Sequence, residues 1–244
     1  MNEYLTVLIL AALPALGNFA GGLLAEAFGV SQRMLSLALH GAAGVVLAVV
    51  GVELMPQVLQ ADPPWLIVLA FAAGGVFFIF VDRAISLAKS QAGDANEHSA
   101  RIWAIFLGVA VDLFSDGLMI GTGSTITLSL GLLLALGQVT ADVPEGFATI
   151  AAFKRQGISR YARLLLAASF ALPVLLGATL GYWIVRDQAE TVKLALLAFT
   201  AGILTTVTVE EIIPESHRDE EARLATLVFV GGFALFTLLS IYFE

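Results

Sequence analysis

The sequence contains no cysteine and few charged residues, and each shortage excludes a class of protein. Without cysteine there is no disulfide and no thiolate metal ligand. Only 13% of the 244 residues are charged and 59% are hydrophobic, and the mean hydropathy of +0.91 is far above that of soluble domains. The 20 acidic residues outnumber the 12 Lys and Arg, which excludes nucleic acid as a partner. We therefore expect an integral membrane protein whose surroundings are a lipid bilayer.

Several motifs of membrane enzymes and pumps are also missing. There is no Gly-x-x-x-x-Gly-Lys phosphate loop, so any driving energy must come from ion gradients or membrane potential. There is no His-Glu-x-x-His zinc protease motif. Residues 1–4 lack the basic start of a cleaved signal peptide, so we expect the first apolar run to remain in the mature protein. We predict no catalytic residue and no bound cofactor.

Eight apolar runs are each long enough to cross a bilayer as an α-helix, which needs roughly 20 residues. They are apolar all round and do not alternate, as the strands of a membrane barrel would. The expected fold class is an all-α integral membrane protein with eight transmembrane helices, in a single domain over residues 1–244. The runs cover residues 5–27, 35–59, 65–88, 102–122, 129–153, 161–185, 192–215 and 223–243.

Basic residues are distributed unevenly between the two ends of these helices. If the N-terminus lies outside, ten Lys and Arg fall at the inner ends and only Arg186 and Lys193 at the outer ends. Because basic residues collect on the cytoplasmic side, we expect both termini to be extracytoplasmic, in a bacterial inner membrane. The ten are Arg33, Arg83, Lys89, Arg101, Lys154, Arg155, Arg160, Arg163, Arg218 and Arg223.

The second and seventh expected helices share a motif at an offset of 158 residues. Each reads Ala-Gly, then apolar residues, then Glu-x-x-Pro, and the two helices would cross the membrane in opposite directions. This pattern indicates an inverted repeat, which in transporters places the binding site at mid-membrane between the repeats. Chance similarity between apolar helices is the alternative. The paired residues are Gly44 with Gly202, Glu53 with Glu211 and Pro56 with Pro214.

Four acidic residues lie inside the fourth and fifth expected helices. Asp112 and Asp116 are four residues apart, and Asp142 and Glu145 three apart, so each pair shares one helix face. An acid at a helix centre costs about 2.5 to 3.5 kcal/mol to insert, and no Lys or Arg lies mid-helix to offset this cost. A cation site accounts for all four acids. Protonated carboxyls hydrogen-bonded between helices are the alternative.

Pro144 lies between the two acids of the fifth expected helix. It cannot donate a hydrogen bond to the Thr140 carbonyl, so we expect a kink there and a freed backbone oxygen, which is a hard ligand. Helix kinks also occur in membrane proteins without any ligand, so Pro144 by itself is weak support for a site.

Other polar residues lie near the ends of the second and seventh expected helices. Solvated carboxylates are the ordinary interpretation, and a role in metal entry or exit is the alternative. His217 could receive a departing cation, although a solvated loop histidine is the simpler interpretation. The acids of this group are Glu53, Glu210, Glu211 and Glu215.

The stretches around the four acids resemble the fourth and fifth helices of the ZIP family of divalent-metal transporters. The similar residues are 117–121, 129–136 and 142–146, and the two Glu-x-x-Pro motifs look like the ends of that family's second and seventh helices. The resemblance implies eight helices, with an inverted repeat of helices 1–3 and 6–8 around helices 4 and 5. It implies a substrate that is a divalent metal ion (zinc, iron(II) or manganese), moved into the cytoplasm. It leaves a homodimer open.

The resemblance also assigns the ligand positions. Asp116, Asp142 and Glu145 match them directly, whereas Asp112 stands where the family has a His. Ala141 stands where the fifth helix often has another His. Losing imidazoles and keeping carboxylates makes a site harder, which moves its preference from zinc towards manganese or iron(II). Carboxylates bind zinc as well, so zinc stays among the candidates.

A second metal of the family's kind would use two further positions. They hold Leu113, where the family commonly has Asn, and Leu172, where some members place a Glu before a Pro. Because neither leucine can bind a cation, we expect one main metal site.

Two other functions fit the same acids. An intramembrane aspartyl protease would use Asp116 and Asp142 as a catalytic pair, but the Gly-x-Gly-Asp context of such enzymes is missing from both helices. A ZIP-like sensor would bind metal without moving it. Metal uptake by proteoliposomes, with protease substrates assayed alongside, separates the three.

Overall fold

The structure is a computed structural model that describes residues 3–28, 31–90, 93–216 and 222–243, and every regular element in this part of the chain is a helix. Arg218 and His217 lie outside the described residues. The elements are α1 (Glu3–Ala27), α2 (Gln32–Ala48), η1 (Val49–Leu54), α3 (Met55–Val58), α4 (Pro64–Ser90), α5 (Gly93–Ser124), α6 (Leu128–Arg155), α7 (Arg160–Ser169), α8 (Ala171–Val185), α9 (Glu190–Val207), η2 (Thr208–Ile212), α10 (Ile213–Ser216) and α11 (Ala222–Phe243).

These elements form the eight long helical segments that the apolar runs predict, because α2, η1 and α3 continue one another, as do α7 with α8 and α9 with η2 and α10. Seven segments among the described residues are long and apolar enough to cross a membrane. The eighth is α6, whose 28 residues give it a length of about 42 Å but which contains Gln138, Asp142 and Glu145. The segment that composition alone does not mark as a span is thus one that carries two of the predicted ligand acids.

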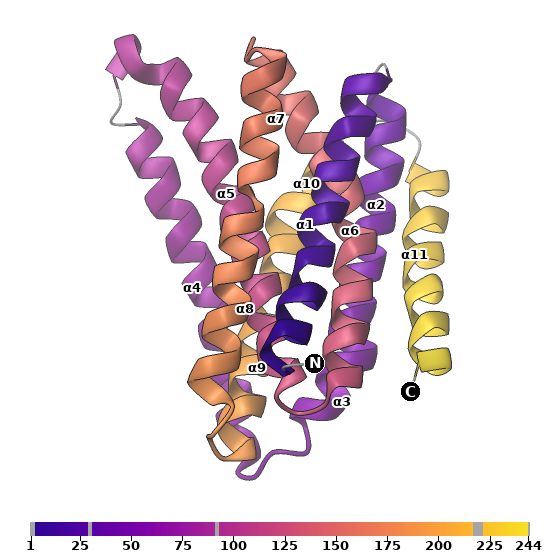
Figure 1. The fold of residues 1–244 in the computed structure, drawn as a ribbon. Coiled ribbons are helices and arrows are strands. Elements are labelled where there is room, and N and C mark those ends of the chain that lie inside the picture. The colour runs from indigo at the N-terminus through magenta and orange to yellow at the C-terminus, as the bar shows by residue number, and fades with distance from the viewer. Residues whose placement is uncertain (1–2, 29–30, 91–92, 217–221, 244) are drawn as a thin grey trace.

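The eight segments run side by side as a bundle, and both ends of the chain lie at the same end of it (Figure 1). One group of helices packs together as α1, α5, α6 and α8, and around it α2 packs on α11 and α4 packs on α9. Large apolar side chains are exposed on the outside of the bundle, with Phe80 65% and Ile241 66% exposed. A surface of this kind suits contact with lipid tails.

The inverted repeat is confirmed by backbone contacts that recur at the predicted offset. A Cβ atom on Gly44 of α2 would lie 2.0 Å from the Phe229 carbonyl oxygen of α11, and one on Gly202 of α9 would lie 2.0 Å from the Phe71 carbonyl oxygen of α4. Both shifts are 158 residues, from 44 to 202 and from 71 to 229. The two helix pairs therefore make the same close approach, at a position that only glycine permits.

A second set of glycine contacts relates α1 with α6 to α8 with α5. Two contacts of one pair recur in the other with shifts of 156 residues from α1 to α8 and 29 residues from α5 to α6. Chance similarity between apolar helices does not reproduce residue-by-residue contacts. The recurring contacts are Gly21 to Val143 with Gly177 to Phe114, and Gly146 to Asn18 with Gly117 to Val174.

The two Glu-x-x-Pro motifs share an irregularity that the sequence pattern did not predict. Each lies in or directly after a π-helical turn, η1 or η2. The Met55 amide donates to the Val50 carbonyl and the Ile213 amide to the Thr208 carbonyl, again 158 residues apart. The proline that follows each of these amides has no N–H to continue the regular pattern, and single π turns are frequent at functional sites.

Proline acts differently in the fifth and sixth helical segments. α6 runs through Pro144 as one helix, so the kink that we expected there does not interrupt it. The sixth segment is instead divided at Phe170, between α7 and α8. Ser169 is the last residue of α7. Because Pro173 has no N–H to donate to the Ser169 carbonyl, the helix is divided there.

Candidate metal centre

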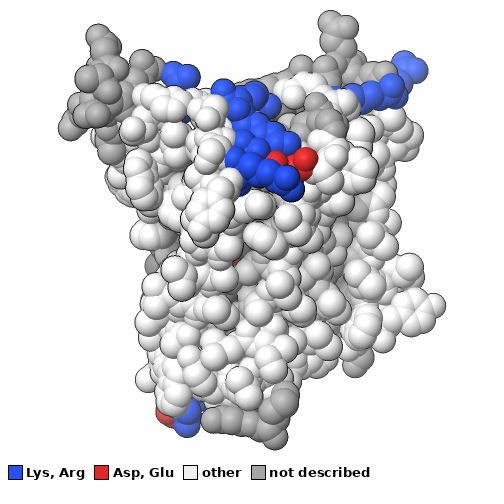
Figure 2. All heavy atoms as spheres, turned by 45° about the horizontal axis from the view of Figure 1, so that its top comes forward, with Lys and Arg blue, Asp and Glu red and all other residues white. Residues whose placement is uncertain are grey.

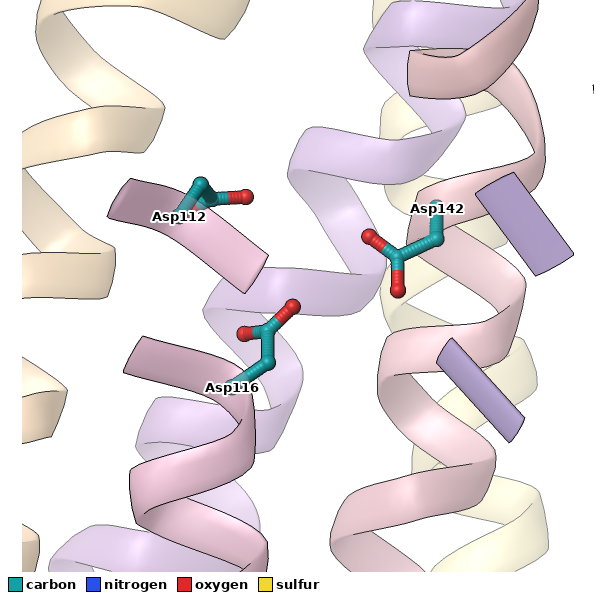
Figure 3. Close-up of side chains that lie close together, drawn as sticks. All are labelled: Asp112, Asp116 and Asp142. Carbon is teal, nitrogen blue, oxygen red and sulfur yellow. The ribbon is translucent and has the colours of Figure 1, made fainter. Parts of the chain in front are cut away.

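Three aspartates from α5 and α6 point toward one another at the middle of the bundle (Figure 3). Asp112 and Asp116 lie one turn apart on α5, and Asp142 lies opposite them on α6. Each offers one carboxylate oxygen, and these three oxygens lie within 4.8 Å of one another. The side chains are 7%, 0% and 1% exposed, in that order. The shared helix face predicted from the spacing is thus the face that α5 turns toward α6.

Glycine next to an acid explains how α5 and α6 can turn their carboxylates inward and still pack closely on the other side. Gly117 follows Asp116, and a Cβ atom there would lie 1.9 Å from the Val174 carbonyl oxygen of α8. Gly146 follows Glu145 and faces the α1 backbone in the same way. The Asp-Gly and Glu-Gly dipeptides therefore place an acid on the inner face and a close helix contact beside it.

The carboxylates are poorly satisfied by hydrogen bonds within the protein. The Gln138 side-chain amide of α6 donates to Asp116 Oδ1. Four buried oxygens have no hydrogen-bond partner: Asp112 Oδ1, Asp116 Oδ2, Asp142 Oδ2 and Gln138 Oε1. A buried acceptor left in this state costs about 1 to 3 kcal/mol, so four of them in one place indicate a missing partner of opposite charge.

Glu145 lies at the edge of this cluster. Its side chain is half-buried and within hydrogen-bonding reach of Asp112 and Asp142. It does not join the three aspartates in the 4.8 Å group, which contains one oxygen from each aspartate. The four residues predicted from the sequence are thus brought together, with three forming a tight group and Glu145 next to it.

A small cavity adjoins the cluster. It is lined by Asp112, Asp142, Glu145 and Gln138 and closed on its other side by apolar residues of α2 and α9 and by Thr208 of η2. It leaves ≈ 10 Å³ for the centre of a water molecule, which is about the room that one water needs. A single cation of similar size fits the same space.

The two positions that a second metal of the family's kind would use do not come together in the structure. Leu113 is fully buried and Leu172 is 71% exposed, on the outside of α8. The 29-residue relation between α5 and α6 pairs Asp112 with Ala141 and Leu113 with Asp142, so only one member of each pair is acidic. The same relation pairs Asp116 with Glu145, which are both acidic, so the cluster follows the repeat at one pair of positions and departs from it at the other two.

The acids at the ends of the second and seventh segments behave differently from our expectation in one case. Glu53 is 4% exposed, and its Oε2 accepts a hydrogen bond of 2.8 Å from the Ser240 hydroxyl of α11, so the prediction of a solvated carboxylate is wrong there. Glu210 is exposed, as expected. The side chains of Glu211 and Glu215 lie outside the described part of the chain, as does His217.

Two polar residues that the sequence reasoning missed belong to this region. Gln138 lies one turn before Asp142 on the same face of α6, a spacing that could have revealed it. Asn18 is 1% exposed on α1, where its Nδ2 has no hydrogen-bond partner and its backbone contacts Gly146. The prediction of the site considered only acidic residues, so it did not include the amide side chains of Gln138 and Asn18.

Comparison with known proteins decides the family. The sequence profile of the ZIP zinc transporters matches residues 90–240, which include α5, α6 and the whole carboxylate cluster. The chain belongs to the ZIP family. ZIP proteins are transporters and not enzymes, so the intramembrane protease is set aside.

Bacterial relatives of the ZIP family match most of the chain. The zinc transporter ZupT of Chlorobium phaeovibrioides is 28% identical over 277 aligned positions, covering 98% of both chains. ZupT of Shigella dysenteriae is 28% identical over 222 positions, covering 85% of both. Human zinc transporter ZIP6 is 28% identical over 150 positions, which are 57% of this chain but 20% of ZIP6. The chain thus spans about a fifth of the length of ZIP6.

Proposed function

We propose that this ZIP protein carries divalent metal cations across the membrane into the cytoplasm, and that Asp112, Asp116, Asp142 and Glu145 bind the cation on its way. The observation that carries the proposal is the group of three buried aspartates with unpartnered oxygens beside a cavity of single-ion size. A cation supplies the positive charge that these oxygens lack, and it does so at mid-membrane, where transporters bind their substrates.

Zinc, manganese and iron(II) are the candidate substrates. The bacterial relatives are named zinc transporters, which favours zinc. The chemistry of the cluster favours the harder ions, because it offers carboxylate and amide oxygens and neither imidazole nor thiolate. We infer that manganese and iron(II) compete well with zinc at this site.

The inward direction rests on the distribution of basic residues. Lys and Arg side chains gather at the end of the bundle where α6 meets α7, away from the end that holds the termini (Figure 2). There Arg163 pairs with Glu26 at 2.5 Å, with Arg160 and Lys154 within 4 Å. We infer that this end faces the cytoplasm and that both termini lie outside.

One cation per chain is the stoichiometry that we infer. The repeat would generate two equivalent sites if paired positions held the same ligands, but Leu113 and Ala141 interrupt that symmetry. A homodimer, if it forms, would then carry one ion in each subunit.

Uptake of manganese and of zinc into proteoliposomes tests the proposal. Asp142→Ala and Glu145→Ala should each abolish uptake of both metals while leaving the protein in the membrane, because each removes a carboxylate from the cavity. Asp187→Ala is the matched control, since its carboxylate is 81% exposed and pairs with Arg186. Unchanged uptake by both cavity variants would refute the assignment, and metal binding without uptake by the parent protein would favour the sensor.

A further inference from the structure

The amide of Gln138 is held in one orientation by its neighbour. An ionised carboxylate can only accept hydrogen bonds, so the Gln138 nitrogen, and not its oxygen, must face Asp116. The planar amide then directs Oε1 away from Asp116. This oxygen is buried, with the side chain 1% exposed, and has no hydrogen-bond partner. Gln138 also lines the cavity beside the aspartates.

A single water molecule cannot satisfy the unpartnered oxygens of Gln138 and the three aspartates. Four of them lack a partner, one each from Asp112, Asp116, Asp142 and Gln138, whereas one water has two O–H groups to donate. A divalent cation accepts four or more oxygen ligands at once. The orientation of the amide therefore makes sense when its oxygen faces a cation.

We propose that Gln138 is a further metal ligand, binding the transported cation through its side-chain oxygen, and that it shifts the site's selectivity toward hard divalent ions such as manganese(II). This inference rests on the proposed transport function and deepens it by naming a selectivity residue. An uncharged amide oxygen suits hard ions with six oxygen ligands, whereas zinc is usually held by four ligands that include nitrogen or sulfur.

The repeat makes Gln138 specific to one side of the site. The 29-residue relation between α6 and α5 pairs Gln138 with Val109, which has no polar atom in its side chain. Gln138 on α6 would thus add an oxygen ligand that has no counterpart on α5. A residue that merely filled space between α5 and α6 would not need a side chain with an oxygen, and an apolar residue would serve as it does at Val109.

Three substitutions at this position separate a ligand from a packing residue. Gln138→Leu removes the oxygen and keeps the bulk, Gln138→Glu keeps an oxygen ligand, and Gln138→His offers a nitrogen. The readout is the equilibrium affinity of the purified protein for manganese(II) and zinc(II), measured separately by calorimetry. Thr140→Val is the matched control on α6, because the Thr140 hydroxyl donates to the Leu136 carbonyl of its own helix.

The expected result is a change in the ratio of the two affinities. Gln138→Leu should weaken manganese binding by about tenfold or more, and zinc binding by less. Gln138→Glu should retain manganese binding, and Gln138→His should raise zinc affinity relative to manganese. Thr140→Val should leave both affinities unchanged.

Two outcomes would overturn the inference. An unchanged affinity ratio in Gln138→Leu and Gln138→His refutes a ligand role, and so does equal weakening of both metals in all three variants with a lowered Tm. Asp142→Ala, measured in parallel, distinguishes a failure of the proposed metal site from a failure of the ligand role of Gln138. If it abolishes binding while the Gln138 variants behave as the parent does, the transport site stands and only the role of Gln138 falls.

Discussion

Under the proposed function, we expect the residues around the cavity to determine which cation it can hold. Asp112 and Ala141 occupy positions that the repeat makes equivalent, and both line the cavity. Ala141 contributes only a methyl group to the lining, so a larger side chain there would extend into the cavity. Under the proposed function, we therefore expect metal selectivity to depend on a few side chains that can be exchanged without changing the fold.

Placing histidines at these two positions should convert the metal preference. The double variant Asp112→His with Ala141→His supplies two imidazole nitrogens, which zinc favours over manganese. In competition uptake with equal concentrations of both metals, the parent should transport manganese appreciably and the double variant should prefer zinc. A parent that is strictly zinc-selective, with a preference that ignores the two histidines, would contradict the hard character that we assign to the site.

At the scale of the helices, glycine contacts hold α5 and α6 in place. Gly117 lies against the backbone of α8 and Gly146 against that of α1, so the packing of these helices and the positions of the neighbouring Asp116 and Glu145 depend on the same dipeptides. A lipid environment provides little hydrophobic driving force between helices, so their association depends on close packing. Small residues such as glycine allow the backbones to approach closely enough for it. A change in this packing should therefore disturb the metal site as well as stability.

The variant Gly117→Ala tests this coupling. Its Cβ atom would lie 1.9 Å from the Val174 carbonyl oxygen, and since a backbone atom cannot turn aside as a side chain can, α5 and α8 must separate. We expect a loss of about 1 to 3 kcal/mol in stability and reduced metal uptake. Gly108→Ala is the control on the same helix, because its Cβ atom meets nothing within 4 Å.

The comparison is read from Tm in detergent together with uptake in proteoliposomes. Gly108→Ala should match or slightly exceed the parent in Tm, because alanine has the higher helix propensity. Equal Tm values and equal uptake for the two variants would show that close packing beside Asp116 is unimportant.

At the scale of the whole molecule, an inverted repeat surrounds an asymmetric site. The outer helices repeat at 156 to 158 residues, and their glycine contacts repeat with them. Of the four acids on α5 and α6, only Asp116 and Glu145 occupy paired positions, whereas Asp112 is paired with Ala141 and Asp142 with Leu113. The molecule thus combines a symmetric scaffold with a single carboxylate cluster.

Orientation is the property of the whole molecule that is most directly measured. The chain has no cysteine, so a single cysteine at Ser159 or at Asp187 gives an unambiguous thiol. Both positions are exposed, in the α6–α7 and α8–α9 connections. We expect an impermeant reagent added outside the cell to label Asp187→Cys and not Ser159→Cys, and labelling of Ser159→Cys alone would reverse the topology.

The sequence predicted the features that follow from local pattern. Apolar runs and helical spacing predicted eight segments, and the shared Glu-x-x-Pro motifs predicted the repeat. The four acids were predicted as one cluster because two short spacings placed them on two helix faces. These inferences need only the chain's own periodicity.

Features that depend on contacts between distant residues were not predictable in this way. Ser240 meets Glu53 across 187 positions in the chain, so nothing near Glu53 indicates that it is buried. The hydrogen bond of Gln138 to Asp116 joins two helices whose relative rotation the sequence does not specify. The π-helical turns depend on how the backbone accommodates a proline within a packed bundle, which is a property of the tertiary structure.

The most direct test of the central claim is the number of metal ions that the purified protein binds. Manganese(II) is added to saturation, unbound metal is removed, and metal per chain is determined by mass spectrometry for the parent and for the triple variant Asp112→Asn, Asp116→Asn and Asp142→Asn. The asparagines keep side-chain size and remove the charge. We predict one ion per parent chain and none in the triple variant. Metal retained by the triple variant, or two ions per parent chain, would contradict a single site built from these three aspartates.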